Sequence, residues 1–429
     1  MALLAAQHPM LLGHALGPVV VAFGLLAAAA GSALRSRPLM VAALVAVLTG
    51  VLIMAKPENL ALLAVALVAM VGAAAALAVR ATTGSPTAPP GDPADIERLR
   101  LLHGRTHMSC FAGSGPKSCL ISPAGAVSYQ VRWGVAVAAG DPLARGTDRA
   151  GVSGAFLALC TARRRVPCFF QTDASLRGLY RDLGLRVVKF GEEAVVDIAA
   201  FDLRTPARAD ARHDVARARR AGLESATLAG PPPSDPFWAE AASVSTAWLS
   251  RRGGREIGFS LGRLGEAVDT ETWYTVARDR EGRLHAFCSW VRVGDDGIAL
   301  DLGRWRSDAA HGAVDLCVVA AIEAARALGL RRVSLGAVAF RESLGDAPDG
   351  RLVRRARASL YRRGRRGYSY RGLSHFKAKF ATHWESRDLV LPRGPSSLLV
   401  LAALARVHLG SRPSPAPPAL LPVELAHVP

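Results

Sequence analysis

The stretch from Ile298 to Leu335 constrains the fold most strongly, because it predicts a complete supersecondary unit. It opens with an apolar run typical of a strand and continues through a polar loop that contains Gly303 and Arg304. Apolar residues then recur at helical spacing over Val314–Leu328, and Arg331–Leu335 is a second β-rich run. Two strands joined through a helix form a parallel crossover, so we expect an α/β fold.

The start of this predicted helix is a candidate site. The first backbone N–H groups of a helix have no partner within the helix, and they suit an anionic or ester oxygen. Asp301 and Arg304 flank this position at the end of the first strand. On residue type alone, an Asp and an Arg three positions apart at a strand end more often form a structural ion pair, so both interpretations stay open.

The first 80 residues predict a membrane anchor. Three runs, Pro9–Leu34, Pro38–Ala55 and Leu60–Val79, contain no Asp, Glu, Lys or Arg and are long enough to span a bilayer. Basic residues in the short connecting loops favour an outside N-terminus and a cytoplasmic body. A cleaved signal peptide is the alternative, but no basic region precedes the first run. We therefore expect three transmembrane helices in residues 1–80, in a multi-pass protein of the inner (plasma) membrane.

Residues 81–95 are rich in Pro, Gly, Ser and Thr and predict a linker. Beyond it, residues 96–225 and 226–395 each predict an antiparallel meander followed by a helix and a strand. This recurrence indicates tandem copies of one fold, with the candidate site in the second copy. Residues 396–429 form a tail, in which Ser397–Leu409 is too short to span a membrane and is expected to pack on the body or lie in the membrane interface.

The chain is strongly basic, with a formal net charge of +18. Arg204–Arg220 holds six Arg against two Asp, and Arg351–Arg387 holds twelve Lys or Arg against one acid. Next to a membrane, such runs suit anionic lipid headgroups or a nucleic-acid backbone, although solvated helix faces give the same pattern. We assign the following residues to this contact: Arg212, Arg219, Arg220, Arg362, Arg363, Arg365 and Arg366.

The six cysteines include no CxxC pair and are expected to be reduced and buried. His103, His107, Cys110 and Cys119 are spaced like no common zinc finger, so we predict neither a metal site nor a cofactor.

Four ordered motifs resemble a known family. They are VAVAAGDPLA from Val135, YRDLGLRVVKFGEEAVVD from Tyr180, DLGRWRSDAAHGAVD from Asp301 with VSLG from Val333, and GLSHFKAKFATHW from Gly372. The chain is similar over about residues 99–391 to the cytoplasmic synthase domain of lysylphosphatidylglycerol synthases, the multiple peptide resistance factor family.

The resemblance implies a tandem acetyltransferase-like (GNAT) fold that does not use acyl-CoA. It implies transfer of an amino acid, lysine in the first instance, from aminoacyl-tRNA to a hydroxyl of phosphatidylglycerol, which alters membrane charge and resistance to cationic peptides. It assigns catalysis to Asp301 and Arg304, and substrate binding to Glu192, Glu193, Lys377 and Lys379.

Other functions remain open at this point. One is an aminoacyl-tRNA-dependent transferase with another lipid or a cell-wall precursor as acceptor. Another is a membrane-tethered GNAT-like protein without catalytic activity. A third, an acyl-CoA N-acetyltransferase, is disfavoured because no Q/RxxGxG/A loop precedes the helix at Val314.

Overall fold

The computed structural model describes residues 93–230, 234–252, 258–265, 272–363, 369–394 and 396–408. The three predicted transmembrane helices and most of the predicted linker lie outside these ranges. Over the ranges described, no helix combines the length and the apolar character that crossing a membrane requires. The first described helix, α4, begins at Pro93, within the last three residues of the predicted linker.

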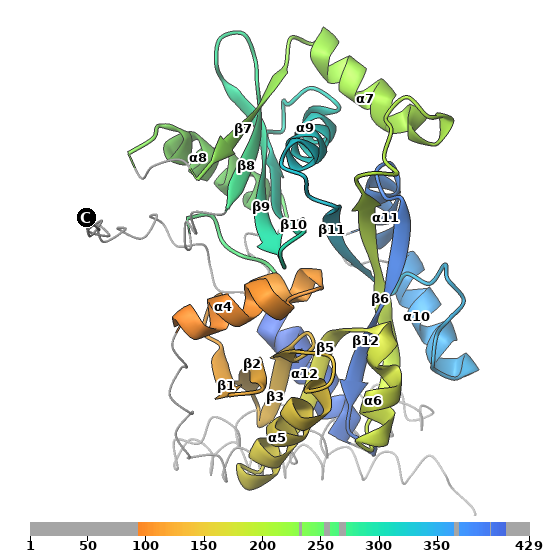
Figure 1. Cartoon of the computed structure of the whole chain (residues 1–429). Helices are drawn as coiled ribbons and strands as arrows, with labels where there is room; N and C mark the ends of the chain where they lie inside the picture. The colour runs from red at the N-terminus through yellow and green to blue at the C-terminus, as the bar shows by residue number, and fades with distance from the viewer. Residues whose placement is uncertain are drawn as a thin grey trace, which may run out of the picture. The chain divides into compact units, whose positions relative to one another are not determined.

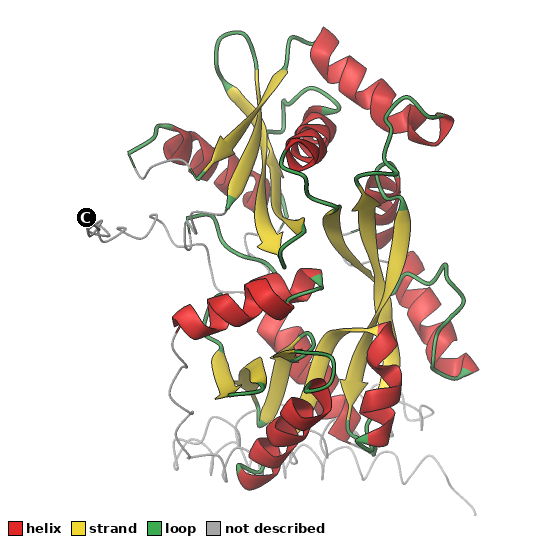
Figure 2. Cartoon of the chain, viewed as in Figure 1, coloured by secondary structure: helices red, strands yellow, loops and turns green. Residues whose placement is uncertain are grey.

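The described body is an α/β structure in which helices cover a mixed sheet (Figure 2). The strands are β1 (Ser118–Ser122), β2 (Gly125–Arg132), β3 (Val135–Ala139), β4 (Leu143–Ala144), β5 (Val166–Asp173), β6 (Arg186–Asp197), β7 (Glu224–Ala229), β8 (Trp273–Arg278), β9 (Leu284–Val293), β10 (Gly297–Trp305), β11 (Arg332–Ala339) and β12 (His383–Leu391).

The described helices lie between and around these strands. They are α4 (Pro93–His103), α5 (Arg149–Ala162), α6 (Arg177–Asp182), α7 (Ala209–Arg220), α8 (Phe237–Ser250), α9 (Ala313–Ala327), α10 (Arg351–Arg363), α11 (Tyr370–Ala378) and α12 (Ser396–His408), with short 3-10 helices η1 (His107–Phe111), η2 (Ala174–Leu176) and η3 (Pro206–Arg208).

The strand order is symmetric about its centre, β1-β2-β3-β5-β12-β6-β11-β10-β9-β8-β7 (Figure 1). One parallel pair, β3 with β5, lies on one side, and the other, β10 with β11, lies on the other. Between them β12 and β6 pair antiparallel. Each parallel pair is therefore extended by a strand from the other part of the chain, because β12 adjoins β5 and β6 adjoins β11.

The predicted unit at the second parallel pair is confirmed, with one correction. Strand β10, helix α9 and strand β11 form the expected parallel crossover. The prediction that Gly303 and Arg304 lie in a polar loop is wrong, because β10 continues to Trp305. The strand continues because Gly303, Arg304 and Trp305 resume pairing with β9 after a register shift.

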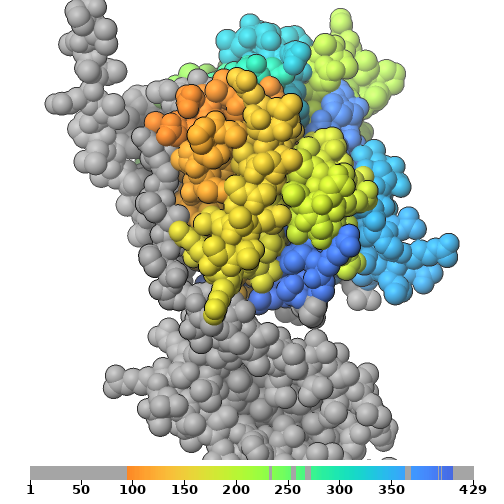
Figure 3. All heavy atoms as spheres, turned by 60° about the horizontal axis from the view of Figure 1, so that its bottom comes forward, coloured from red at the N-terminus to blue at the C-terminus, as the bar shows by residue number. Residues whose placement is uncertain are grey.

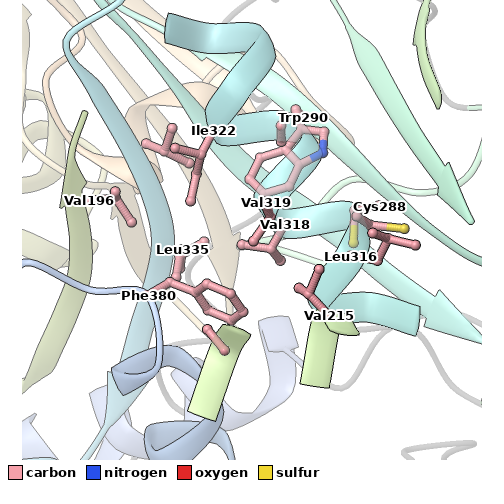
Figure 4. Close-up of a cluster of buried hydrophobic side chains, with 14 of the residues drawn as sticks. Val196, Val215, Cys288, Trp290, Leu316, Val318, Val319, Ile322, Leu335 and Phe380 are labelled. Atoms are coloured by element: carbon pink, nitrogen blue, oxygen red, sulfur yellow. The ribbon is translucent and has the colours of Figure 1, made fainter. Parts of the chain in front are cut away.

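The core beside this unit lies between α9 and the sheet (Figure 4). Trp290, Val319, Ile322 and Leu335 are at most 2% exposed. The indole of Trp290 can be fully buried because its Nε1–H donates to Thr275 Oγ1 at 2.9 Å. Burying each such side chain contributes about 1.5–3 kcal/mol, so α9 holds the ends of β10 and β11 firmly in place.

The predicted amphipathic segment of the tail packs on the body. Helix α12 buries Val400, Ala403, Leu404 and Val407 in a cluster shared with β3 and β5. Apolar contacts with the sheet therefore anchor the end of the described chain.

Candidate active site

The two strands of the second parallel pair diverge shortly after they meet. Strands β10 and β11 pair only over residues 297–299 and 332–334. Beyond these residues β10 shifts register against β9, and β11 shifts register against β6. Helix η1 fills the opening, because the ring of His107 lies there and its Nε2 is 2.8 Å from the carbonyl oxygen of Leu300. Such a divergence leaves backbone groups of both strands available to neighbouring side chains.

Gly336 makes room for this ring. Its φ is +78°, a conformation that favours glycine, and it follows Ser334 where β11 departs from regular pairing. A Cβ at this position would lie 3.1 Å from His107 Nε2. A larger residue would therefore displace the histidine.

His107 presents a free acceptor at the site. Burial lowers the pKa of His107, so its ring is neutral near pH 7. With Nε2–H donating to Leu300, Nδ1 keeps a lone pair. Within the described ranges this Nδ1 atom is buried without a hydrogen-bond partner.

A buried ion pair stands next to this ring. Glu193 is fully buried; Arg387 Nε donates to one of its oxygens at 2.6 Å and Ser334 Oγ to the other at 2.5 Å. Burial alone would raise the pKa of Glu193, but Arg387, His107 and Ser334 together lower it to about 2. The carboxylate is therefore ionised under all ordinary conditions.

Lys377 contributes a second nitrogen base. Its Nζ donates to the carbonyl oxygens of Gly336 at 2.9 Å and Ala337 at 3.2 Å. Burial lowers the pKa of Lys377 to about 7, although Glu193 opposes the shift. A neutral amine has two N–H groups, which these two carbonyls satisfy, so its lone pair remains available to accept a proton.

Asp301 is held at the edge of the same opening. It accepts a hydrogen bond from the backbone N–H of Gly262 at 2.7 Å and one from Ser289 Oγ at 3.1 Å. Asp301 and Glu193 both add to the effect of burial, which raises the pKa of Cys110 to about 12. The two carboxylates therefore act electrostatically on one buried thiol.

Arg304 points toward helix α8. Its guanidinium carbon lies 4.1 Å from the ring centroid of Trp248, and its Nη1 donates to Gly303 O at 3.3 Å. The side chain is largely buried. Stacking on an indole orients the planar guanidinium.

Glu192 and Glu193 have separate environments, because neighbouring residues of a strand face opposite sides of the sheet. The Glu192 carboxylate accepts from Lys189 Nζ at 2.8 Å, from Arg341 Nε at 2.9 Å and from both the backbone and the side chain of Ser343. These contacts tie β6 to the chain that follows β11.

Lys377 and Lys379 are likewise separated. Lys379 Nζ binds Asp214 at 2.9 Å and also contacts the carboxylate of Asp315. It therefore ties α11 to helices α7 and α9.

The predicted basic residues divide into three groups. Arg219 and Arg220 on α7 and Arg362 on α10 are exposed, and α10 lies on the outer surface of the body (light blue in Figure 3). Arg212 is also exposed, but its Nη1 donates to the carbonyls of Leu203 and Thr205. The Arg363 side chain and all of Arg365 and Arg366 lie outside the described residues.

Three residues at the site were not assigned from the sequence, namely His107, Ser334 and Arg387. His107 was considered only as a zinc ligand, and the described residues contain no cluster of ligands suited to a metal ion. Ser334 lies in the quoted VSLG motif, which gave it no role. Arg387 lies in β12, a strand that the sequence did not predict.

Comparison with known proteins places the body in a family. Residues 97–390 match the family described as phosphatidylglycerol lysyltransferase, C-terminal. A lysylphosphatidylglycerol biosynthesis bifunctional protein, LysX, of Mycobacterium avium is 32% identical over 270 residues, which cover 60% of this chain and 23% of that protein. LysX of Mycobacterium tuberculosis H37Rv is 29% identical over 326 residues, or 71% of this chain and 28% of that protein. The matches thus span only about a quarter of these relatives.

Two solved structures share the fold. L-PGS from Bacillus licheniformis aligns with a TM-score of 0.64 and 25% identity over 76% of this chain and 98% of that one. A domain from Agrobacterium fabrum, named for the C-terminal domain of a lysylphosphatidylglycerol synthetase, aligns with a TM-score of 0.64 and 26% identity over 75% of this chain and 99% of that one. The expected α/β, GNAT-like fold is thereby confirmed for the described body. The chain belongs to the phosphatidylglycerol lysyltransferase C-terminal family.

Proposed function

We propose that this chain is a membrane-associated aminoacyltransferase that moves an amino acid, lysine in the first instance, from aminoacyl-tRNA to a hydroxyl of phosphatidylglycerol. Membership of the family supports transfer to phosphatidylglycerol. The observation that carries the chemistry is the pair of nitrogen bases, Lys377 and His107, which lie buried where β10 and β11 diverge and whose pKa values burial lowers.

The reaction exchanges one ester for another. The lipid hydroxyl oxygen attacks the aminoacyl carbonyl carbon, its proton passes to a base, and the ribose oxygen leaves after receiving a proton. Because the bonds broken and formed are of the same kind, the enzyme's task is to position the substrates, stabilise the tetrahedral oxyanion and exclude water.

The roles follow from the charges. Lys377 or His107 accepts the hydroxyl proton, since each has a lone pair near pH 7. Asp301 binds the ammonium group of the amino acid. Arg304, oriented by Trp248, binds the oxyanion or the lipid phosphate.

Mass spectrometry of extracted lipids tests the proposal. Cells expressing the intact chain should contain a new aminoacylated phosphatidylglycerol, whose mass identifies the amino acid. Cells expressing Asp301→Ala should lack it, whereas Arg280→Gln, at an exposed residue of the β8–β9 turn, should leave it unchanged. Absence of the lipid despite folded, membrane-bound protein would reject phosphatidylglycerol as the acceptor.

A further inference from the structure

A separate cavity lies at the other parallel pair of the sheet. Strands β3 and β5 run parallel over 135–139 and 166–170, and a cavity of about 210 Å³ lies beyond their carboxyl ends. In α/β folds ligands bind at such strand ends. None of the residues assigned above to aminoacyl transfer lines this cavity.

One wall of the cavity is anionic. Asp141 follows β3 and Asp173 ends β5, and the backbone N–H of Asp173 donates to Asp141 at 2.9 Å. Tyr180 donates to the other Asp141 oxygen at 3.0 Å. Each carboxylate oxygen accepts more than one hydrogen bond, so both side chains can still accept from a ligand. Burial and the neighbouring Asp173 carboxylate raise the pKa of Asp141 to about 7, so a bound cation would favour its ionised form.

The cavity is also lined by a cation, Arg149. Arg149 is the first residue of α5, whose N-terminal end carries a partial positive charge. Its Nε is buried and, within the described ranges, has no hydrogen-bond partner. Burying a guanidinium N–H group without an acceptor costs free energy, so we expect an acceptor atom of a ligand to bind here.

We propose that this cavity binds a small zwitterion, with its ammonium group on Asp141 and Asp173 and its anionic group on Arg149 at the start of α5. A free α-amino acid has this chemistry, and so does phosphoethanolamine. An amino acid esterified to RNA has no free carboxylate, so this site would distinguish free from esterified amino acid.

One side chain, Arg387, links the cavity to the candidate active site through hydrogen bonds. Arg387 Nη1 donates to Asp173 at 2.9 Å, and Arg387 Nε donates to Glu193 at 2.6 Å. A ligand ammonium on Asp173 would therefore compete for a carboxylate that helps to hold Arg387. The binding claim itself does not depend on the proposed transferase activity.

Isothermal titration calorimetry of the full chain in detergent tests the site. The probes are L-alanine, L-lysine and phosphoethanolamine, together with L-alanine methyl ester, N-acetyl-L-alanine and inorganic phosphate. At least one zwitterion should bind, and the capped forms, which lack one charge, should bind at least about tenfold more weakly, the effect of losing one charged hydrogen bond.

Variants separate this site from a merely structural cluster. Asp141→Asn, which preserves shape, and Arg149→Gln should each abolish binding, whereas Arg149→Lys should retain part of it. Arg145→Gln, at an exposed residue of the same loop, is the matched control. The proposal is overturned if no zwitterion binds, if capped forms bind equally well, or if phosphate alone binds and Asp141→Asn leaves its affinity unchanged.

Discussion

Lys377 and Glu193 are both buried, yet Glu193 is ionised over the whole ordinary pH range, whereas Lys377 loses its proton as the pH rises through about 7. Burial disfavours the charged form of each, but Glu193 has the Arg387 guanidinium at 2.6 Å, while Lys377 donates to backbone carbonyls. The position of one arginine therefore decides which group keeps its charge. This residue comes from β12, which joins the sheet from the far end of the described chain.

Replacing Lys377 with Arg should remove the proton acceptor but keep a basic side chain of similar length at this position. Because a guanidinium stays protonated, we expect the transfer rate to fall about 10²- to 10⁴-fold if Lys377 is the base. The native rate should rise with pH through about 7, as Lys377 loses its proton. Initial rates between pH 6 and 8, with lysyl-tRNA and phosphatidylglycerol vesicles, measure both effects. An unchanged rate and profile in Lys377→Arg would shift the role to His107, to be tested with His107→Gln.

Glu193→Gln should destabilise the body by about 1 to 3 kcal/mol, because the buried Arg387 loses a charged, fully buried partner while it keeps Glu385 and Asp173. The pKa of Glu193 is about 2 in the folded protein, below its value of about 4.3 in an unfolded chain. Its stabilising effect is therefore present above about pH 4 and is lost as the pH falls toward 2. Denaturant unfolding of both proteins from pH 7 to 3 measures the difference, which should shrink with falling pH. A constant difference would contradict the assigned charge.

At the scale of elements, the divergence of β10 and β11 creates the site. The sequence correctly predicted the crossover, because α9 has a long apolar periodicity and a second strand-like run follows it at β11. It did not predict that β10 would resume pairing beyond its register shift, because a bulge depends on the neighbouring strand. The buried Glu192 and Glu193 lie within one continuous strand, β6.

Gly336→Ala should test how closely β11 approaches η1. The variant meets two penalties, a positive φ and a Cβ at 3.1 Å from His107, and we expect a loss of about 2 kcal/mol. Gly329→Ala is the matched control, since its φ is +71° but no atom lies within 4 Å of its Cβ. Thermal unfolding should show the larger loss for Gly336→Ala. Equal losses would mean that His107 moves aside without cost.

At the scale of the whole molecule, surface charge determines how polyanions approach. Among the described residues, no carboxylate contacts the exposed Arg219 and Arg220 of α7 in the way that Asp214 holds Lys379, so these arginines suit phosphate groups. Arg212 differs, because its backbone hydrogen bonds give it a structural role.

Replacing Arg219 and Arg220 together with Gln should weaken tRNA binding and reduce its dependence on salt. Each lost phosphate contact lowers the slope of log affinity against log salt by about 0.7 to 0.9, so the double variant should lower it by about 1.5. Arg212→Gln should instead lower the melting temperature and keep the slope. Filter binding at several salt concentrations distinguishes them, and an unchanged slope in the double variant would remove α7 from the tRNA surface.

The sequence by itself determined the local elements, because apolar periodicity and turn residues act over a few positions. It also determined the family resemblance, since the motifs keep their order along the chain. Only the tertiary structure decided which charges meet. Arg387 reaches Glu193 across 194 positions because β12 inserts between β5 and β6, and His107 reaches Leu300 across 193 because η1 fills the opening beside β10. Such contacts depend on strand order and register, which the periodicity of one segment does not encode.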